Sequence, residues 1–375
     1  LLTITSPPPL HTAITLSKDI RSPLPPPWQH FTGGHPLPTN NSLTATQTIR
    51  DHLTPLTKQD ILLVLLSGGT SALCAAPHIS LTAWIELNQA LLHSGAPITA
   101  INQIRTFFDA VKGGGLTRWA YPAITHTLIL NDIIGDWHWV GSRPTLPLTA
   151  SLSPTHITAI FDRYQIWPHL SPATLTAIHH WLTTASPLAP SPPSPPPILL
   201  GSNHHATQPL IPLLQQHGYT PTLLTNHLQG EAREVGRVAA ALALGLPPHH
   251  ALILGGETTV TVTGDGRGGR NQELALAALA TLANAPNRWL AAWSTDGEDF
   301  LPNVAGAFIT PHTATLAHHH NLLPHTFLAN NDSYQFFSTL ETLSGQPALI
   351  RTGATGTNVN DLLIIGHGPS TIKDK

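Results

Sequence analysis

Residues 61–71 read ILLVLLSGGTS, and this stretch decides the fold class. The six consecutive apolar residues at 61–66 are typical of a strand that is buried on both faces of a parallel sheet. The glycine-containing segment at 67–69 then ends the strand at a turn. In open α/β sheets, ligands bind beyond the carboxyl ends of the strands, so this turn is a candidate binding loop.

Strands and helices alternate along the rest of the chain. Apolar residues at helical spacing predict helices at 81–93, 98–111, 204–217 and 230–244. Short apolar or β-branched runs predict strands at 128–130, 198–200, 222–225, 251–254 and 258–263. Such alternation is typical of a doubly wound α/β fold with a parallel sheet.

The length of 375 residues exceeds what one hydrophobic core usually serves, so two domains are expected. We predict a Rossmann-like N-terminal domain at 1–248 and a smaller α/β C-terminal domain at 249–368, where a glycine-dense segment begins. Residues 187–197 are mostly proline, and we interpret them as a surface insertion. A ligand for an SH3-type domain is the alternative for this insertion.

Composition excludes several classes of protein. No apolar run approaches the roughly 20 residues of a membrane helix, and the net charge of −3 without a basic stripe disfavours nucleic-acid binding. The one cysteine, Cys74, excludes an intramolecular disulfide framework. We expect a cytoplasmic protein and leave a homodimer open. The 24 histidines predict stability that depends on pH between about 5 and 7.

The densest chemical signal is residues 255–273, GGETTVTVTGDGRGGRNQE. Glycines let backbone N–H groups turn toward one anion, and arginines bind phosphate or carboxylate oxygens with two N–H groups. Asn271 opens an Ala/Leu-rich helix, whose positive end is expected to face the same anion. We predict a positive cradle formed by Arg267 and Arg270. The alternative is a hairpin loop with two solvated arginines.

The Ser67–Ser71 turn is a second candidate anion loop, and Arg105 and Lys112 add two cations on and after one predicted helix. A plain turn and a solvated helix end are the alternatives here. Carboxylates follow apolar stretches at Asp132, Asp136 and Asp296, as magnesium-dependent phosphoryl transfer requires. Each alone could equally form a turn or a helix cap.

Several motifs are missing. The sequence contains no Gly-Lys pair and therefore no P-loop, and it lacks the protein-kinase motifs. No Gly-x-Gly-x-x-Gly lies in a strand-to-helix turn with a suitable acidic residue downstream, so a dinucleotide fold has no support. The histidine pairs lack the spacing of metal ligands and are interpreted as compositional bias.

The motifs together resemble one family. The resemblance extends from about residue 34 to 366, in the order GHPLP (34–38), LSGGTSAL (66–73), INQIR (101–105), KGG (112–114), residues 256–273, TDG (295–297), NDSY (331–334) and TGTNVNDL (355–362). This order resembles the glycerate 2-kinase family, two-domain kinases whose C-terminal part is called the MOFRL domain.

The resemblance implies ATP-dependent phosphorylation of D-glycerate at its 2-hydroxyl, with Mg²⁺, in a cleft between the two domains. Arg270 is implied to stabilise the transferring phosphoryl group or the glycerate carboxylate, and Asp296 to act as a base or hold metal. Asp132 and Asp136 are assigned to the metal. The residues assigned to substrate or nucleotide binding are Ser67, Gly68, Gly69, Ser71, Arg105, Lys112, Glu257, Arg267, Asn271, Asn331 and Asn358.

The sequence departs from the family pattern in four places. The chain has no methionine and no counterpart of the family's glycine-lysine-alanine turn, so we expect an N-terminally truncated chain. The family's Arg-Lys-His-Leu-Ser run is RTFFD at 105–109, its Ser-Gly-Pro-Thr is SRPT at 142–145, and Thr70 replaces a glycine. A non-catalytic member that binds a nucleotide or sugar acid is therefore the alternative function, and a hydroxypyruvate reductase is the third.

Overall fold

The structure is a computed structural model that describes residues 9–18, 24–147, 152–186 and 191–368. The chain divides into two compact units. The first contains Leu1–Ile129 and His138–Ile198, and the second contains Leu130–Trp137 and Leu199–Lys375. Part of the predicted proline-rich insertion, residues 187–190, lies outside the described residues.

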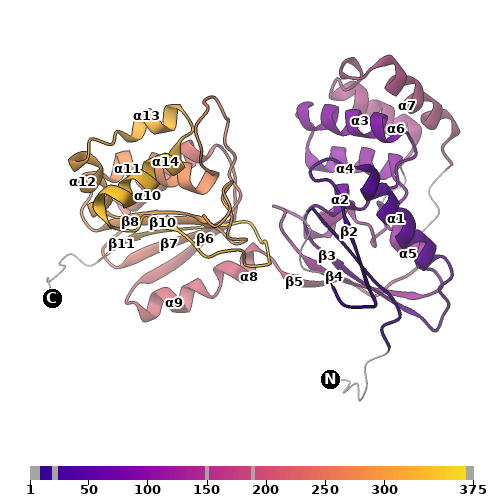
Figure 1. Cartoon of the computed structure of the whole chain (residues 1–375), viewed down its shortest axis with the longest axis horizontal. Helices are drawn as coiled ribbons and strands as arrows, with labels where there is room; N and C mark the ends of the chain where they lie inside the picture. Colours follow the sequence, from indigo (N-terminus) through magenta and orange to yellow (C-terminus); the bar gives the residue numbers. More distant parts are fainter. Residues whose placement is uncertain (1–8, 19–23, 148–151, 187–190, 369–375) are drawn as a thin grey trace. The chain divides into compact units, whose positions relative to one another are not determined.

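The first unit combines short parallel strands with helices (Figure 1). Its strands are β1 (Ala13–Ser17), β2 (Trp28–Thr32), β3 (Ile61–Leu66) and β4 (Ile124–Leu130). Its helices are α1 (Asn40–Leu53), α2 (Thr70–Leu73), α3 (Leu81–His93), α4 (Ile98–Phe108), α5 (Gly115–Ala120), η1 (Trp137–Ser142), α6 (Pro154–Arg163), η2 (Trp167–His169) and α7 (Pro172–Thr184). β1 pairs with β2 and β3 with β4, both in parallel. The second sheet has the order β3-β4-β5, in which β5 is Ile198–Gly201.

Two hydrophobic clusters stabilise the first unit. One joins α3, α4, α6 and α7 around the buried side chains of Trp84, Phe108 and Phe161. The other packs Leu62 and Val64 of β3 against side chains of α1 and α5. Burial of these apolar side chains supplies most of the favourable free energy of folding.

The other face of β3 is open. Ile61, Leu63 and Leu65 alternate with the packed residues and are each more than half exposed. The prediction that this strand is buried on both faces is therefore wrong, because the described helices cover only one side of it.

The second unit is a six-stranded mixed sheet with helices on both faces (Figure 1). The strands of this sheet are β6 (Thr220–Leu228), β7 (His250–Gly256), β8 (Arg288–Ser294), β9 (Gly306–Ile309), β10 (Leu349–Ile350) and β11 (Asp361–His367). Its helices are α8 (Asn203–Thr207), α9 (Leu210–Gln216), α10 (Ala232–Gly245), α11 (Arg270–Leu282), α12 (Pro311–His319), α13 (Pro324–Ala329) and α14 (Ser333–Ser344). The sheet order is β10-β9-β8-β11-β7-β6, parallel only between β6 and β7.

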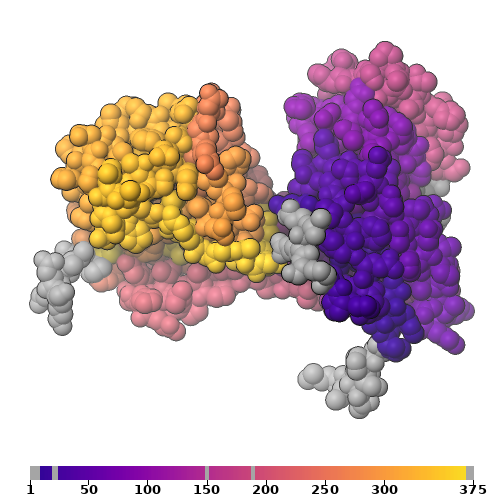
Figure 2. Space-filling view, viewed as in Figure 1, coloured from indigo at the N-terminus to yellow at the C-terminus, as the bar shows by residue number. Residues whose placement is uncertain are grey.

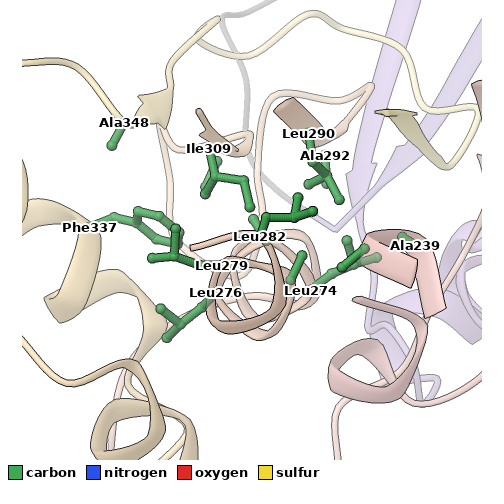
Figure 3. Packing of buried hydrophobic residues seen from close by; sticks show 14 of the residues in the cluster. Ala239, Leu274, Leu276, Leu279, Leu282, Leu290, Ala292, Ile309, Phe337 and Ala348 are labelled. Atoms are coloured by element: carbon green, nitrogen blue, oxygen red, sulfur yellow. The ribbon is translucent and has the colours of Figure 1, made fainter. Parts of the chain in front are cut away.

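Helix α11 lies at the centre of the larger core of this unit. Its Leu279 lies beside Phe337, and its Leu282 lies on the side of Ile309 (Figure 3). On the opposite face of the sheet, Ile253 of β7 packs with Leu214 of α9. The residues from α11 to β11, orange to yellow in Figure 2, share one continuous surface of this unit.

The predicted mixed α/β class with parallel pairing is confirmed, because β3 pairs with β4 and β6 with β7 in parallel.

Several expected elements differ from those observed. The expected helix at 204–217 is two helices, α8 and α9, which flank Pro209. The expected strand at 258–263 is a loop, because its backbone N–H groups bond to side chains: Thr261 N donates to Glu231 and Thr263 N to Asn331. The predicted domain boundary at 248/249 lies inside the second unit, since β6 pairs with β7 across it.

Candidate active site

The sheet topology of the second unit gathers carboxylates at one edge. β11 runs antiparallel to both β7 and β8, and its first residue, Asp361, pairs with Gly256 and Ser294 at their carboxyl ends. Glu257 directly follows β7, and Asp296 follows β8. Three acidic side chains that are far apart in the sequence are therefore brought to the same end of the sheet.

Arg270 binds two of these carboxylates. It is the first residue of α11, after the N-cap Gly269. Its Nε and Nη2 donate to Asp361 Oδ2 and Oδ1 at 2.5 and 2.9 Å, and its Nη1 lies 2.9 Å from Glu257 Oε1. The guanidinium is thus held at three points in one orientation.

The electrostatics match this geometry. Burial alone lowers the pKa of Arg270, but the hydrogen bonds and charge of Asp361 outweigh burial and raise it. Burial raises the pKa of Glu257 and of Asp361, and Arg270 opposes both shifts. Acidic groups outnumber this one cation, so the site has spare negative charge.

Asp132 adds a carboxylate with an unsatisfied oxygen. Asn360 links it to the cluster, because its Nδ2 donates to the Asp132 carbonyl at 2.6 Å and to Glu257 Oε2 at 3.0 Å. Asp132 Oδ1 is buried without a hydrogen-bond partner. Burial, with the nearby charge of Glu257, raises the pKa of Asp132 to about 6. A buried carboxylate oxygen without a donor fits a bound cation.

Asp296 is held by its own loop. Its Oδ1 accepts hydrogen bonds from Ser294 Oγ at 2.7 Å and from Glu298 N at 2.9 Å. Its charge contributes to the raised pKa values of Glu257 and Asp361, so it lies within electrostatic reach of both. The structure therefore brings Arg270, Glu257, Asp296 and Asp132 into one cluster.

Asp299 occupies the start of α11. Its buried carboxylate accepts from Asn271 N at 3.1 Å and Gln272 N at 2.9 Å. Asn271 Nδ2 also donates to it, at 3.3 Å. In this structure the protein's own carboxylate lies where a ligand anion was expected at the helix end, and ligand binding by Asn271 stays a prediction.

The glycines of the Gly264–Gly269 loop serve packing. A Cβ on Gly268 would lie 2.0 Å from Ser333 Oγ, and one on Gly266 would lie 2.4 Å from Asn330 O. Arg267 is exposed, with its guanidinium 5.8 Å from the centre of the Tyr334 ring. The predicted two-arginine cradle is therefore wrong, since only Arg270 joins the carboxylates.

Asn331 is a structural residue. Its Oδ1 accepts from Thr263 N at 2.7 Å and Gly264 N at 3.1 Å, and its Nδ2 donates to Thr261 O and Glu273 Oε2. The buried amide is fully used inside the protein, and its role in ligand binding stays a prediction.

Two further predicted residues lie close to the cluster in sequence. Asn358 Oδ1 accepts from Asn360 N at 2.9 Å and so shapes the turn before β11. Asp136 is exposed. In the part of the chain that the structure describes, no three His, Cys, Asp or Glu side chains form a metal-binding group.

In the first unit, the Ser67–Ser71 turn joins a hydroxyl network. Gly69 has a φ of 79° and begins α2, and Ser67 is exposed at the end of β3. Ser71 Oγ lies 2.7 Å from Ser142 Oγ, which donates to Asn102 Oδ1 at 2.8 Å. Asn102 belongs to the INQIR motif and Ser142 to the SRPT segment of the sequence analysis, but neither residue was assigned to the site there.

The two cations predicted near this turn differ. Lys112 is fully buried, and its Nζ donates to Ser71 O and Cys74 O and pairs with Asp109 at 3.3 Å. Its three donors are thus used inside the protein, and its predicted role in substrate or nucleotide binding stays a prediction. Arg105 Nε donates to Asn88 Oδ1 at 2.8 Å, the one hydrogen bond that this guanidinium forms within the described chain.

The missed residues share one property. Asp361, Asn360 and Asp299 act through partners that are distant in the sequence, so neither spacing nor composition marks them. The signal for Asp361 and Asn360 was their place in the TGTNVNDL motif (355–362), where an apolar strand begins, whereas the carboxylates that were found follow apolar strands.

Comparison with known proteins identifies both halves of the chain. Residues 9–179 match a domain of unknown function, DUF4147, and residues 250–361 match the MOFRL family. A D-glycerate 2-kinase of Thermotoga maritima is 34% identical over 344 residues, which cover 89% of this chain and 79% of the relative. A protein of Agrobacterium vitis described as a putative hydroxypyruvate reductase is 35% identical, over 88% of this chain and 75% of the relative.

A solved structure agrees. The crystal structure of a glycerate kinase from Thermotoga maritima superposes with a TM-score of 0.82 at 33% identity, covering 95% of this chain and 85% of that one.

Proposed function

Because the chain belongs to the glycerate 2-kinase family, we propose that it transfers a phosphoryl group from ATP to the 2-hydroxyl of D-glycerate. The observation that carries the proposal is the three-point attachment of Arg270 to Asp361 and Glu257. Phosphoryl transfer depends on charge that is positioned before the reaction, and an arginine in one fixed orientation supplies it.

Arg270 neutralises negative charge that develops on the transferring phosphoryl group. Two of its nitrogens are held by Asp361, and Glu257 holds the third, so reorientation of the guanidinium is restricted. An incoming phosphoryl oxygen competes with Glu257, the more exposed of the two carboxylates, for Nη1.

Asp296 orients the attacking hydroxyl. Its Oδ1 is held by Ser294 and Glu298, while its Oδ2 accepts no hydrogen bond from the described residues. That oxygen can accept the proton of the 2-hydroxyl.

Mg²⁺ fits at Asp132, whose buried Oδ1 has no partner. An ion held there by Asp132 would neutralise phosphate charge, and Mg²⁺ sites in kinases commonly use one or two carboxylates together with substrate phosphates. Asp136 is the second candidate ligand. The interdomain location of the reaction, a homodimer and a cytoplasmic location stay predictions from the sequence.

An ADP-release assay with ATP, Mg²⁺ and D-glycerate tests the proposal. Arg270→Lys loses the two-point attachment and Asp296→Asn loses the proton acceptor, so we expect kcat to fall by about 10²-fold or more in each, with a melting temperature close to that of the unmodified chain. Rates like those of the unmodified chain in both variants contradict these roles.

The same assay separates the alternatives. ATP and D-glycerate binding without ADP release identifies a non-catalytic binding protein, which the departures at 105–109 and 142–145 favour. NADH oxidation with hydroxypyruvate identifies a reductase, the activity in the description of the Agrobacterium vitis relative.

A further inference from the structure

The hydroxyl network of the first unit has a fixed direction. Ser142 Oγ is buried and has a single proton, which it donates to Asn102 Oδ1 at 2.8 Å. Ser71 Oγ, 2.7 Å away, must then donate its own proton to Ser142. Ser71 is thereby left with free lone pairs, so it can accept a hydrogen bond from a ligand but has no proton to donate.

The backbone that holds Ser142 is strained. Gly141, Ser142 and Arg143 have φ values of 63°, 60° and 58°, a left-handed run in which two of the three residues carry side chains. Hydrogen bonds to the start of α5 hold it there, from Gly113 N to Ser142 O at 3.2 Å and from Gly114 N to Arg143 O at 2.8 Å. Strain that the surrounding structure maintains is typical of functional sites.

Arg105 lies one helical turn after Asn102 on α4, so the two share a face, with Cβ atoms about 5–6 Å apart. Its Nε is fixed by Asn88, whose own Nδ2 is fixed by Trp84 O. Burial lowers the pKa of Arg105, which the charge of Asp109 partly offsets, and no carboxylate within the described residues lies in ion-pair distance. Its two terminal nitrogens have no hydrogen-bond partner there.

A second half-buried arginine shows the difference. Arg118 also lacks a carboxylate, but its terminal nitrogens donate to Gly113 O, Ala110 O, Lys112 O and Ser191 Oγ. Arg118 is therefore satisfied inside the protein, whereas Arg105 keeps two N–H-bearing nitrogens for a ligand.

We propose that Arg105 and Ser71 form the acid-recognition subsite for a small hydroxycarboxylate: Arg105 binds the carboxylate with both terminal nitrogens, and Ser71 Oγ accepts a hydrogen bond from a hydroxyl of the same molecule. A nucleotide phosphate fits less well, because its oxygens need donors and Ser71 has none to offer. The identity of the acid as D-glycerate rests on the proposed function.

Calorimetric titration of the full chain tests this subsite without requiring turnover. We expect Arg105→Gln to weaken D-glycerate binding by about 30-fold or more and Arg105→Lys by about 10-fold, since a lysine cannot bind a carboxylate at two points. ATP affinity stays within about twofold. The matched control, Arg163→Gln, alters an exposed arginine of the same unit and leaves D-glycerate binding unchanged.

Ser71→Ala provides an independent arm. It weakens binding of D-glycerate by about fivefold but leaves binding of propionate, which has a carboxylate and no hydroxyl, unchanged. Circular dichroism checks that all variants are folded.

The outcomes separate this proposal from the kinase assignment. The subsite is overturned if Arg105→Gln binds D-glycerate as tightly as the unmodified chain does, or if it loses affinity for ATP and not for D-glycerate. This holds even if the unmodified chain is an active kinase. Binding of D-glycerate that depends on Arg105, without ADP release, retains the subsite and refutes the kinase. An unmodified chain that does not bind D-glycerate overturns both.

Discussion

Asp361 holds Arg270 at two points, with Nε 2.5 Å from Oδ2 and Nη2 2.9 Å from Oδ1, and Asp361 itself is 9% exposed. The pair joins the first residue of β11 to the first residue of α11. It restricts reorientation of the guanidinium beside Glu257, so we expect Asp361 to act on the proposed reaction through Arg270.

Asp361→Asn tests this positioning role. The amide keeps the size of the side chain but loses its charge and one of its two acceptor oxygens, so Arg270 can turn away. We expect kcat to fall by about 10- to 100-fold, with little change in the KM for D-glycerate. Steady-state kinetics measures both values. The control variant is Glu234→Gln, which removes an exposed ion pair with Arg237. A kcat within twofold of the unmodified chain contradicts the role.

Asp299 predicts a pH dependence of stability. Burial raises its pKa from 3.8 to about 6, so the folded chain binds this proton more tightly than the unfolded chain. The stabilisation from this proton is complete below about pH 3.8 and is lost as the pH rises through about 6. As the pH rises between these two values, the free energy of unfolding therefore falls relative to that of a chain without this group. The fall is at most about 1.4 kcal/mol per pH unit.

Asp299→Asn isolates this effect from the 24 histidines, which both proteins share. Denaturant unfolding at several pH values between 4 and 7 gives the difference in stability between the two proteins. We expect the advantage of the unmodified chain to shrink across this range and then become constant. A difference that is independent of pH shows that the pKa of Asp299 is not raised.

The sequence predicted what depends on local pattern. The run at 61–66 is β3 and the helical spacing at 81–93 is α3, because apolar periodicity over one element is set by which face it buries. The motifs also marked Arg270, Glu257, Asp296 and Asp132, which the sheet edge gathers.

What the sequence could not predict depends on distant partners. Arg267 and Arg270 look alike in the sequence. Arg267 nevertheless lies exposed over the ring of Tyr334, whereas Arg270 binds Asp361, 91 residues away in the chain. Lys112 resembled a solvated or ligand-binding lysine, but its carbonyl partners belong to the α2 segment. Every residue has a backbone carbonyl, so the residue types do not show which carbonyls will surround a lysine. The burial of the Lys112 side chain therefore cannot be inferred from the sequence.

Asn331→Gly tests whether this amide serves stability. Glycine tolerates the φ of 52° at this position, so the substitution removes the hydrogen bonds without adding backbone strain. We expect a loss of about 2–4 kcal/mol in the free energy of unfolding, because Thr263 N and Glu273 lose buried partners. Thermal and denaturant unfolding measure it, with the exposed Asn284→Gly as control. A loss equal to that of the control shows that the amide is dispensable.

Gly268→Ala tests the packing explanation of the glycine loop. The added Cβ would lie 2.0 Å from Ser333 Oγ and 3.0 Å from Tyr334 N, so the loop must move away from the start of α14. We expect a loss of about 2 kcal/mol or more in the free energy of unfolding. Ser333→Gly in the same chain removes the closest clash, so the double variant should recover part of that loss. Gly245→Ala, where a Cβ meets nothing within 4 Å, should be neutral or stabilising. If Gly268→Ala is instead as stable as Gly245→Ala but binds ATP more weakly, the loop contacts the nucleotide through its backbone and the packing explanation fails.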